Sequence, residues 1–306
     1  MRYVLIASLL NIGCIADLDV FKHNPRHCSV VGVDTCEDIE EVMDKICTKC
    51  AEDYPFAERG MPADRVTKLA FQSDGVENDA YFVKAAEGSA LEHVTIIFAH
   101  GNYASIEHYL HSMEAIYGSG ANLFAFEYPG YGQSSSESAP SETAFFANAD
   151  AAYALLLSEL ASRNLQASDV VFFGMSLGAL PSVHLAKQHS GATALILESP
   201  YPSASLFLED SSATSIPASF ILSGSYDNLE KIPDVTLPTL VMHSEGDDFI
   251  RVEHSDRLFE AMNEPKCFWR TTQAKHGVSN GIAVKEGYDR YAQIIGDWIA
   301  NQTCPE

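Results

Sequence analysis

The stretch VVFFGMSLGAL, residues 170–180, constrains the fold of this chain more than any other. Four β-favouring residues run straight into Gly174, Ser176 and Gly178, and an apolar helical face begins after them. A serine on so sharp a turn from strand to helix needs small neighbours, because its backbone is strained and crowded by both elements. An ordinary loop with a capping serine is the alternative, since G-x-S-x-G also arises by chance. We expect the Ser176 hydroxyl to stand clear of a buried sheet.

Around this turn the sequence alternates strands with helices. The first two strands, 66–72 and 80–86, are expected to form an antiparallel hairpin. Six more apolar runs predict strands at 94–99, 122–127, 170–173, 192–198, 238–244 and 267–272. Helices are expected near 105–117, 142–160, after Ser176, near 254–263 and within 282–300. The alternation predicts an α/β fold with an eight-stranded, mostly parallel sheet, helices on both faces and, with fewer than 40 residues between the sixth and seventh strands, a minimal cap.

Four of these strands end in polar sequences, AHGNY, GMSLG, SEGDD and AKHGV. In open α/β sheets, reactive groups lie beyond the carboxyl ends of the strands. Ser176 is the candidate nucleophile, His276 its general base, and Asp247 the carboxylate that holds the imidazole in the useful tautomer. Asp248 stands beside it, and one of these two acids must be an ordinary loop residue. The order serine, aspartate, histidine along the chain is the one expected for a catalytic triad in such a sheet.

Two backbone N–H groups are candidate donors to an oxyanion that develops during the reaction. They belong to Asn102, after the third strand, and to Leu177, after the candidate nucleophile. His100 and Gly101 precede Asn102, and we expect His100 to brace this turn rather than to act as a base.

A pair of histidines and a pair of cysteines have spacings that could also indicate a metal site. His108 and His111 are three residues apart on an expected helix, but no carboxylates stand at ligand spacing, so we interpret them as surface residues. The CTKC sequence, with Cys47 and Cys50, would be half of a zinc site or a redox motif, but no second pair follows it. We expect neither a metal nor an organic cofactor.

The chain resembles the α/β-hydrolase superfamily over residues 66–301. It is particularly similar to the serine-hydrolase branch that includes serine aminopeptidase-like proteins, monoglyceride lipases and α/β-hydrolase-domain depalmitoylases. The resemblance rests on FAHGNYASIEHYL, EYPGYGQSSSESAPSE, FFGMSLGALPSVHLA and the stretch from DNLEKI to RLFEA. It implies that Asp247, not Asp248, is the acid of the triad. Ser244 stands where the family usually has glycine, and Arg251 where it often has proline.

The motifs and the resemblance together predict a serine hydrolase. We expect it to cleave small-molecule carboxylic esters or thioesters through an acyl-enzyme on Ser176. A serine peptidase of the same fold is an alternative, although it would need an acidic anchor for the substrate amine. An inactive binding protein with this fold is a second alternative, but such chains usually lose a member of the triad.

Residues 1–16 have the pattern of an export signal. After Met1 and Arg2 come fourteen uncharged residues, too few to span a bilayer but suited to the apolar region of a signal. A buried first strand is the alternative. LNIGC resembles a lipobox that would lipidate Cys14 and tether the protein to a membrane, whereas CIA would allow cleavage after Ala16. We expect export to the cell envelope or periplasm, or else secretion.

Six further cysteines agree with export, where disulfides persist. Four of them fall in an N-terminal extension, residues 17–64, which precedes the expected hydrolase domain at 65–306. The sequence does not choose among the 15 pairings that six cysteines allow. The six are Cys28, Cys36, Cys47, Cys50, Cys267 and Cys304.

The net charge narrows the choice of partners. The chain has 42 acidic and 19 basic residues, a formal charge of −23. Nucleic acid is therefore excluded as an expected partner, because phosphate binding needs basic patches. A strongly acidic surface also disfavours docking to anionic lipid.

Overall fold

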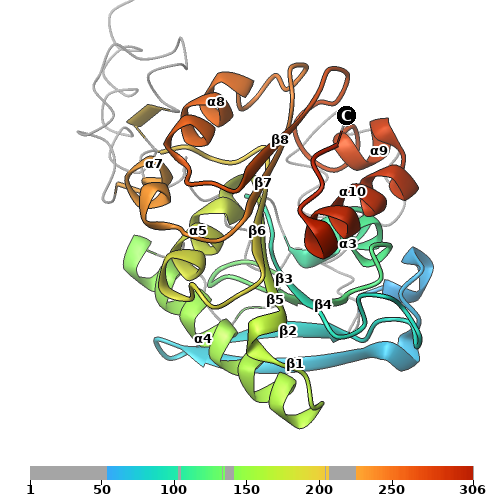
Figure 1. The fold of residues 1–306 in the computed structure, drawn as a ribbon. Coiled ribbons are helices and arrows are strands. Elements are labelled where there is room, and N and C mark those ends of the chain that lie inside the picture. Colours follow the sequence, from blue (N-terminus) through green and yellow to red (C-terminus); the bar gives the residue numbers. More distant parts are fainter. Residues whose placement is uncertain are drawn as a thin grey trace, which may run out of the picture.

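An eight-stranded sheet runs through the middle of the computed structural model (Figure 1). The structure describes residues 54–102, 105–132, 134, 141–203, 205–206 and 225–305. The strand order is β1-β2-β4-β3-β5-β6-β7-β8; β1 and β2 run antiparallel to their neighbours and the others are parallel. This confirms the expected fold. The strands are β1 (Val66–Ser73), β2 (Val76–Val83), β3 (Thr95–Ala99), β4 (Asn122–Phe126), β5 (Val170–Met175), β6 (Ala194–Glu198), β7 (Thr239–Ser244) and β8 (Lys266–Thr271).

Helices cover both faces of the sheet (Figure 1). One face carries α4 (Glu142–Ser162), α5 (Ala179–Gln188), α7 (Asn228–Lys231) and α8 (Val252–Ala261). The other carries α3 (Leu110–Tyr117), α9 (Ile282–Glu286) and α10 (Tyr288–Asn301). The longest of these helices, α4, begins where the Ser141 side chain accepts a hydrogen bond from the Ala144 N–H at 3.2 Å. Its predicted apolar stripe packs on the sheet, although Phe146 and Leu157 are only partly buried.

The largest departures from the expected elements lie in β2 and near the C-terminus. β2 starts at Val76, four residues early, because the tight turn at Asp74 and Gly75 lets polar residues such as Asn78 pair with β1. The single helix expected within 282–300 is two helices. Gly287, at φ +91°, interrupts it between α9 and α10 with a backbone conformation that other residues rarely adopt.

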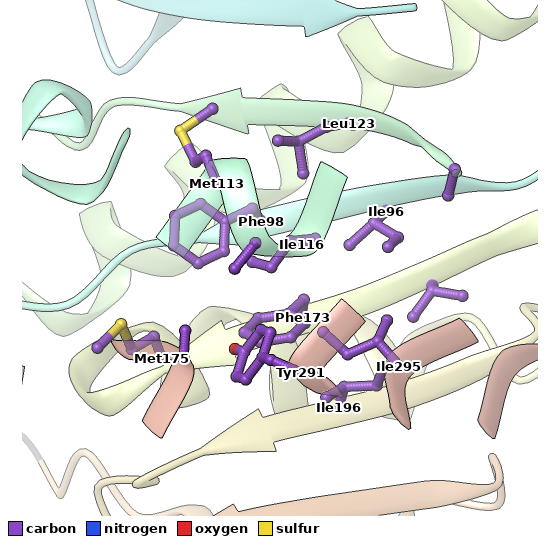
Figure 2. Close-up of a cluster of buried hydrophobic side chains, with 14 of the residues drawn as sticks. Ile96, Phe98, Met113, Ile116, Leu123, Phe173, Met175, Ile196, Tyr291 and Ile295 are labelled. Carbon is purple, nitrogen blue, oxygen red and sulfur yellow. The ribbon is translucent and has the colours of Figure 1, made fainter. Parts of the chain in front are cut away.

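One of the two cores lies between the sheet and the helices α3 and α10. Ile96 and Phe98 of β3, Phe173 of β5, Met113 of α3 and Ile295 of α10 meet there (Figure 2). Three residues before the expected domain boundary also pack into this core: Tyr54, Phe56 and Met61. The last part of the predicted extension therefore packs against the sheet and α3, while the boundary at residue 65 itself stays a prediction.

Several predictions fall outside the described residues. These are the export signal at 1–16 with Cys14, the pairing of the four cysteines between 28 and 50, and most of the segment that would form a cap. Among the described residues, a disulfide joins Cys267 in β8 to Cys304 in the C-terminal tail, with Cα atoms 5.7 Å apart. None of the described helices combines the length and the apolarity that crossing a bilayer requires.

Candidate active site

Ser176 stands on a strained turn between β5 and α5. Its φ of +54° is in the left-handed region, which costs a non-glycine residue about 1–3 kcal/mol. The turn is possible only because the residues at 174 and 178 are glycines, which have no side chain to collide with the neighbouring backbone. A Cβ on Gly174 would lie closer than 3.0 Å to the backbone at Gly178, and one on Gly178 equally close to the carbonyl of Ala99. The strand, the turn and the helix start are thus pressed together, backbone against backbone.

The structure brings the three candidate triad residues together at the carboxyl ends of β5, β7 and β8. The Ser176 Oγ lies 2.9 Å from Nε2 of His276, and Nδ1 of the same ring lies 2.8 Å from Oδ2 of Asp247. Because a carboxylate can only accept, Nδ1 carries the hydrogen and Nε2 is free to accept from the serine. Serine, base and carboxylate therefore stand in the order that nucleophilic catalysis requires.

Asp247, and not its neighbour Asp248, faces the imidazole. Burial would raise the pKa of Asp247, but hydrogen bonds from His243 and His276 outweigh it and hold the pKa well below its usual range. The backbone N–H groups of Phe249 and Ile250 both donate to its Oδ1 at 2.9 Å. Asp248 is instead exposed and forms an ion pair with Lys275 at 3.3 Å. The carboxylate beside His276 is therefore fixed and ionised.

The turn after β3 lies against the serine. A Cβ on Gly101 would be 3.4 Å from that of Ser176 and 2.7 Å from the hydroxyl of Tyr109, so a side chain there would collide with the site. His100 is fully buried, and its Nδ1 donates to the Gly101 carbonyl at 2.9 Å. The side-chain Oδ1 of Asn102 accepts a hydrogen bond from Tyr131 at 2.5 Å. Leu177, the other predicted oxyanion donor, is buried directly after Ser176.

A cavity of about 570 Å³ opens onto Ser176 and His276. Tyr109, Met175 and Phe249 give it apolar walls. The ring of Phe249 is 51% exposed and lies 5.0 Å from that of His276. A larger groove of about 840 Å³, between α3 and α10, contains no triad residue. The smaller cavity is thus the one placed to hold a substrate.

The two histidines considered as a metal pair have other contacts. His108 is partly exposed and lines the cavity, and it lies in the 3₁₀ turn Ile106–Tyr109. His111 meets the Tyr288 hydroxyl at 2.7 Å and Arg59 at 3.2 Å. Across the described residues, His, Cys, Asp and Glu side chains do not gather in threes as a metal site would need.

Glu198 is a residue of this region that the motifs did not single out. It ends β6, is fully buried, and its Oε2 accepts a hydrogen bond from the Tyr291 hydroxyl of α10. Burial raises the pKa of Glu198 to about 7, even though the Tyr291 hydrogen bond acts in the opposite direction. It lines a small cavity together with Gly277 and Val278, which follow His276 in the chain. The rule that polar residues at strand ends are reactive could have identified it.

Comparison with known protein families finds a match that includes Ser176. The family model described as "Serine aminopeptidase, S33" matches residues 92–207. Among curated relatives, "Alpha/beta hydrolase domain-containing protein 17B" of Xenopus laevis is 33% identical over 215 residues, covering 68% of this chain and 67% of that protein. The human protein of the same name is 32% identical, with 56% of each chain covered. The chain thus spans about half to two thirds of the length of such relatives.

Solved structures agree on the fold. An esterase of Pyrococcus furiosus superposes with a TM-score of 0.62 at 17% identity, covering 82% of this chain and 98% of that one. Est1E of Butyrivibrio proteoclasticus, solved with ferulic acid bound, gives 0.60 at 14% identity over 76% of this chain and 98% of its own. At these identities the likeness shows the architecture alone. Together with the curated relatives, it confirms the expected resemblance: the chain belongs to the α/β-hydrolase superfamily.

Proposed function

We propose that this hydrolase cleaves carboxylic esters or thioesters through an acyl-enzyme on Ser176. The observation that carries the proposal is the continuous chain from Ser176 Oγ to His276 Nε2 at 2.9 Å and from His276 Nδ1 to Asp247 Oδ2 at 2.8 Å. Serine alone is too weakly acidic to attack a carbonyl, and an oriented imidazole removes that obstacle.

The reaction then runs in two halves. As Ser176 Oγ attacks the carbonyl carbon, its proton passes to His276 Nε2, and the carbonyl oxygen becomes an oxyanion that the N–H groups of Asn102 and Leu177 stabilise. When the intermediate collapses, His276 returns the proton to the departing alcohol or thiol. Water then attacks the acyl-enzyme, with His276 again as the base. The ionised Asp247 stabilises the imidazolium that forms in each half.

The cavity supports a neutral substrate with a small apolar acyl group. Met175, Tyr109 and Phe249 offer apolar contact close to Ser176. The surplus of negative charge should oppose polyanionic substrates, to an extent that salt screens. The fold itself does not separate esterase from peptidase, since an acylaminoacyl peptidase of Pyrococcus horikoshii also superposes with a TM-score of 0.61.

A panel of substrates tests this proposal. Purified protein is assayed with p-nitrophenyl esters, an acyl thioester and a p-nitroanilide, alongside the variant Ser176→Ala. We expect ester and thioester turnover, with a loss of about a millionfold in kcat in the variant. Ser162→Ala, at the exposed end of α4, is the matched control and should retain wild-type rates. Turnover that survives in Ser176→Ala, or hydrolysis confined to the anilide, would overturn the proposal.

We also propose that the protein acts outside the cytoplasm, either tethered through a lipidated Cys14 or released after cleavage. The basis is the apolar run that precedes the first acidic residue, Asp17. The intact mass of protein purified from the cell envelope and from the medium tests it. Recovery of the full-length, unmodified chain from the cytoplasm alone would contradict it.

A further inference from the structure

Tyr54 lies in a part of the chain that no motif marks. It precedes residues 92–207, the region matched by the family model. Its buried ring lies 5.2 Å from that of Tyr81, and its hydroxyl donates to Oε1 of Glu127 at 2.9 Å across 73 positions of sequence. Burial and the charge of Glu127 raise the pKa of Tyr54 well above its usual value, so the hydroxyl keeps its proton and remains a donor.

Glu127 is a fully buried side chain directly after β4. Its Oε1 accepts from Tyr54 and from the backbone N–H of Ile106, each at 2.9 Å. Its Oε2 lies 3.3 Å from Nε2 of His100, a close contact without hydrogen-bond alignment. Burying a carboxylate costs several kcal/mol unless its partners compensate. The two hydrogen bonds to Oε1 fix the carboxylate in place, and its Oε2 faces the Nε2 edge of the His100 ring.

His100 in turn holds one peptide group in place. Its Nδ1 donates to the Gly101 carbonyl at 2.9 Å. That carbonyl and the N–H of Asn102 belong to the same planar, trans peptide, so they point in opposite directions. Holding the Gly101 oxygen toward the imidazole aims the Asn102 N–H the other way. A rotation of this one peptide would remove a predicted oxyanion donor without moving the triad.

We infer that Tyr54 is a positioning residue for the oxyanion-binding turn, acting through Glu127 and His100 on the peptide between Gly101 and Asn102. The inference rests on the proposed function of Ser176. The segment before the matched hydrolase region thus completes the site rather than merely preceding it. Because an oxyanion exists only in the intermediate and the transition states that flank it, a loss of this alignment lowers kcat and leaves ground-state binding of the ester unchanged.

The variant Tyr54→Phe tests this role, because it keeps the buried ring and removes only the hydroxyl. Removing an oxyanion donor outright costs about 10²–10³ in kcat, and we expect misalignment of one to cost about tenfold for p-nitrophenyl butyrate, with KM within about twofold of wild type. The affinity for phenylboronic acid, which forms an anionic tetrahedral adduct on the serine, should fall in parallel. Glu127→Gln, which keeps the shape of the side chain, should give the same split between kcat and KM.

Tyr117→Phe is the matched control. That hydroxyl is hydrogen-bonded as well, to Arg65 at 3.2 Å and to the Lys84 carbonyl at 2.9 Å. It lies outside the site, so rates and boronate affinity should stay at wild-type values. Thermal unfolding of each variant shows whether a lower kcat comes from a misaligned oxyanion donor or from a destabilised fold. Wild-type kcat and boronate affinity in Tyr54→Phe, or a rise in KM alone, would overturn the inference. Such a result leaves the proposed function standing, because that is decided by Ser176→Ala.

Discussion

His243 and Asp247 form a buried pair in which Nε2 of the histidine lies 3.2 Å from Oδ2 of the aspartate. The same oxygen faces Nδ1 of His276, so two imidazoles converge on it. His243 is held in turn by Ser255, whose Oγ lies 2.6 Å from its Nδ1. One carboxylate oxygen is thus shared by the reactive ring and by a second ring that does not reach the substrate cavity. This second imidazole helps to keep Asp247 ionised and immobile.

Replacing either Asp247 or Asp248 by asparagine should therefore have very different effects on kcat. Asp247→Asn removes the negative charge beside His276 and offers an N–H₂ group to rings that already present N–H. We expect kcat to fall by about 10⁴, as in comparable triads. Asp248→Asn breaks only the exposed contact with Lys275 and should lose far less. Steady-state kinetics on a p-nitrophenyl ester measures both, and the reverse ranking would show that Asp248 is the acid.

Glu198 should make the stability of the protein depend on pH. Its pKa is about 7 in the folded state, against 4.5 for an ordinary glutamate, so between these values the folded protein holds a proton that the unfolded chain has lost. Stability contributed by this group is complete below about pH 4.5 and falls as the pH rises to about 7. Glu198→Gln removes the effect. Relative to wild type, its free energy of unfolding should rise by about 3 kcal/mol between pH 4.5 and pH 8.

Urea unfolding at several pH values measures this difference. Glu260→Gln, an exposed glutamate on α8, is the control, and its stability should follow the wild type at every pH. A Glu198→Gln profile parallel to that of the wild type would contradict the prediction.

The cross-link between Cys267 and Cys304 should contribute to stability without entering the chemistry. It spans 37 residues, a loop length for which the chain-entropy model gives about 4 kcal/mol. The double variant Cys267→Ser, Cys304→Ser should lose about 2–4 kcal/mol of unfolding free energy and keep its kcat at 25 °C. Equal unfolding free energies of the double variant and the wild type would contradict this prediction.

Phe249 should govern how activity depends on the length of the substrate. Each buried methylene adds about 0.8 kcal/mol, so kcat/KM should rise with chain length until the cavity is full and then fall. Phe249→Ala should flatten this rise. Val284→Ala, another exposed apolar side chain but away from the triad, should reproduce the wild-type curve. The same assays should cross the critical micelle concentration smoothly, and a sharp increase there would mean that an interface activates the enzyme.

The sequence was sufficient to predict which strand ends carry the candidate triad. It was not sufficient to predict the buried contacts that hold the surrounding residues in place. The proximity of Ser176, Asp247 and His276 could be predicted because each follows a buried strand, and parallel strands bring such ends to one edge. Tyr291 and Glu198 could not be paired, because their contact joins a helix to a strand across 93 residues. The contact from Tyr54 to Glu127 spans 73. No periodic pattern encodes such pairs, since they depend on how whole elements pack.

The link between Cys267 and Cys304 has a consequence beyond its energy. His276, α9 and α10 with Tyr291 all lie between these two cysteines, so the base and the hydroxyl that contacts Glu198 occupy one covalent ring. The Ser176 and Asp247 loops are outside that ring. A chain shortened by three residues would retain every member of the triad yet open the ring. Opening the ring would therefore remove a covalent constraint from the segment that carries the proposed general base.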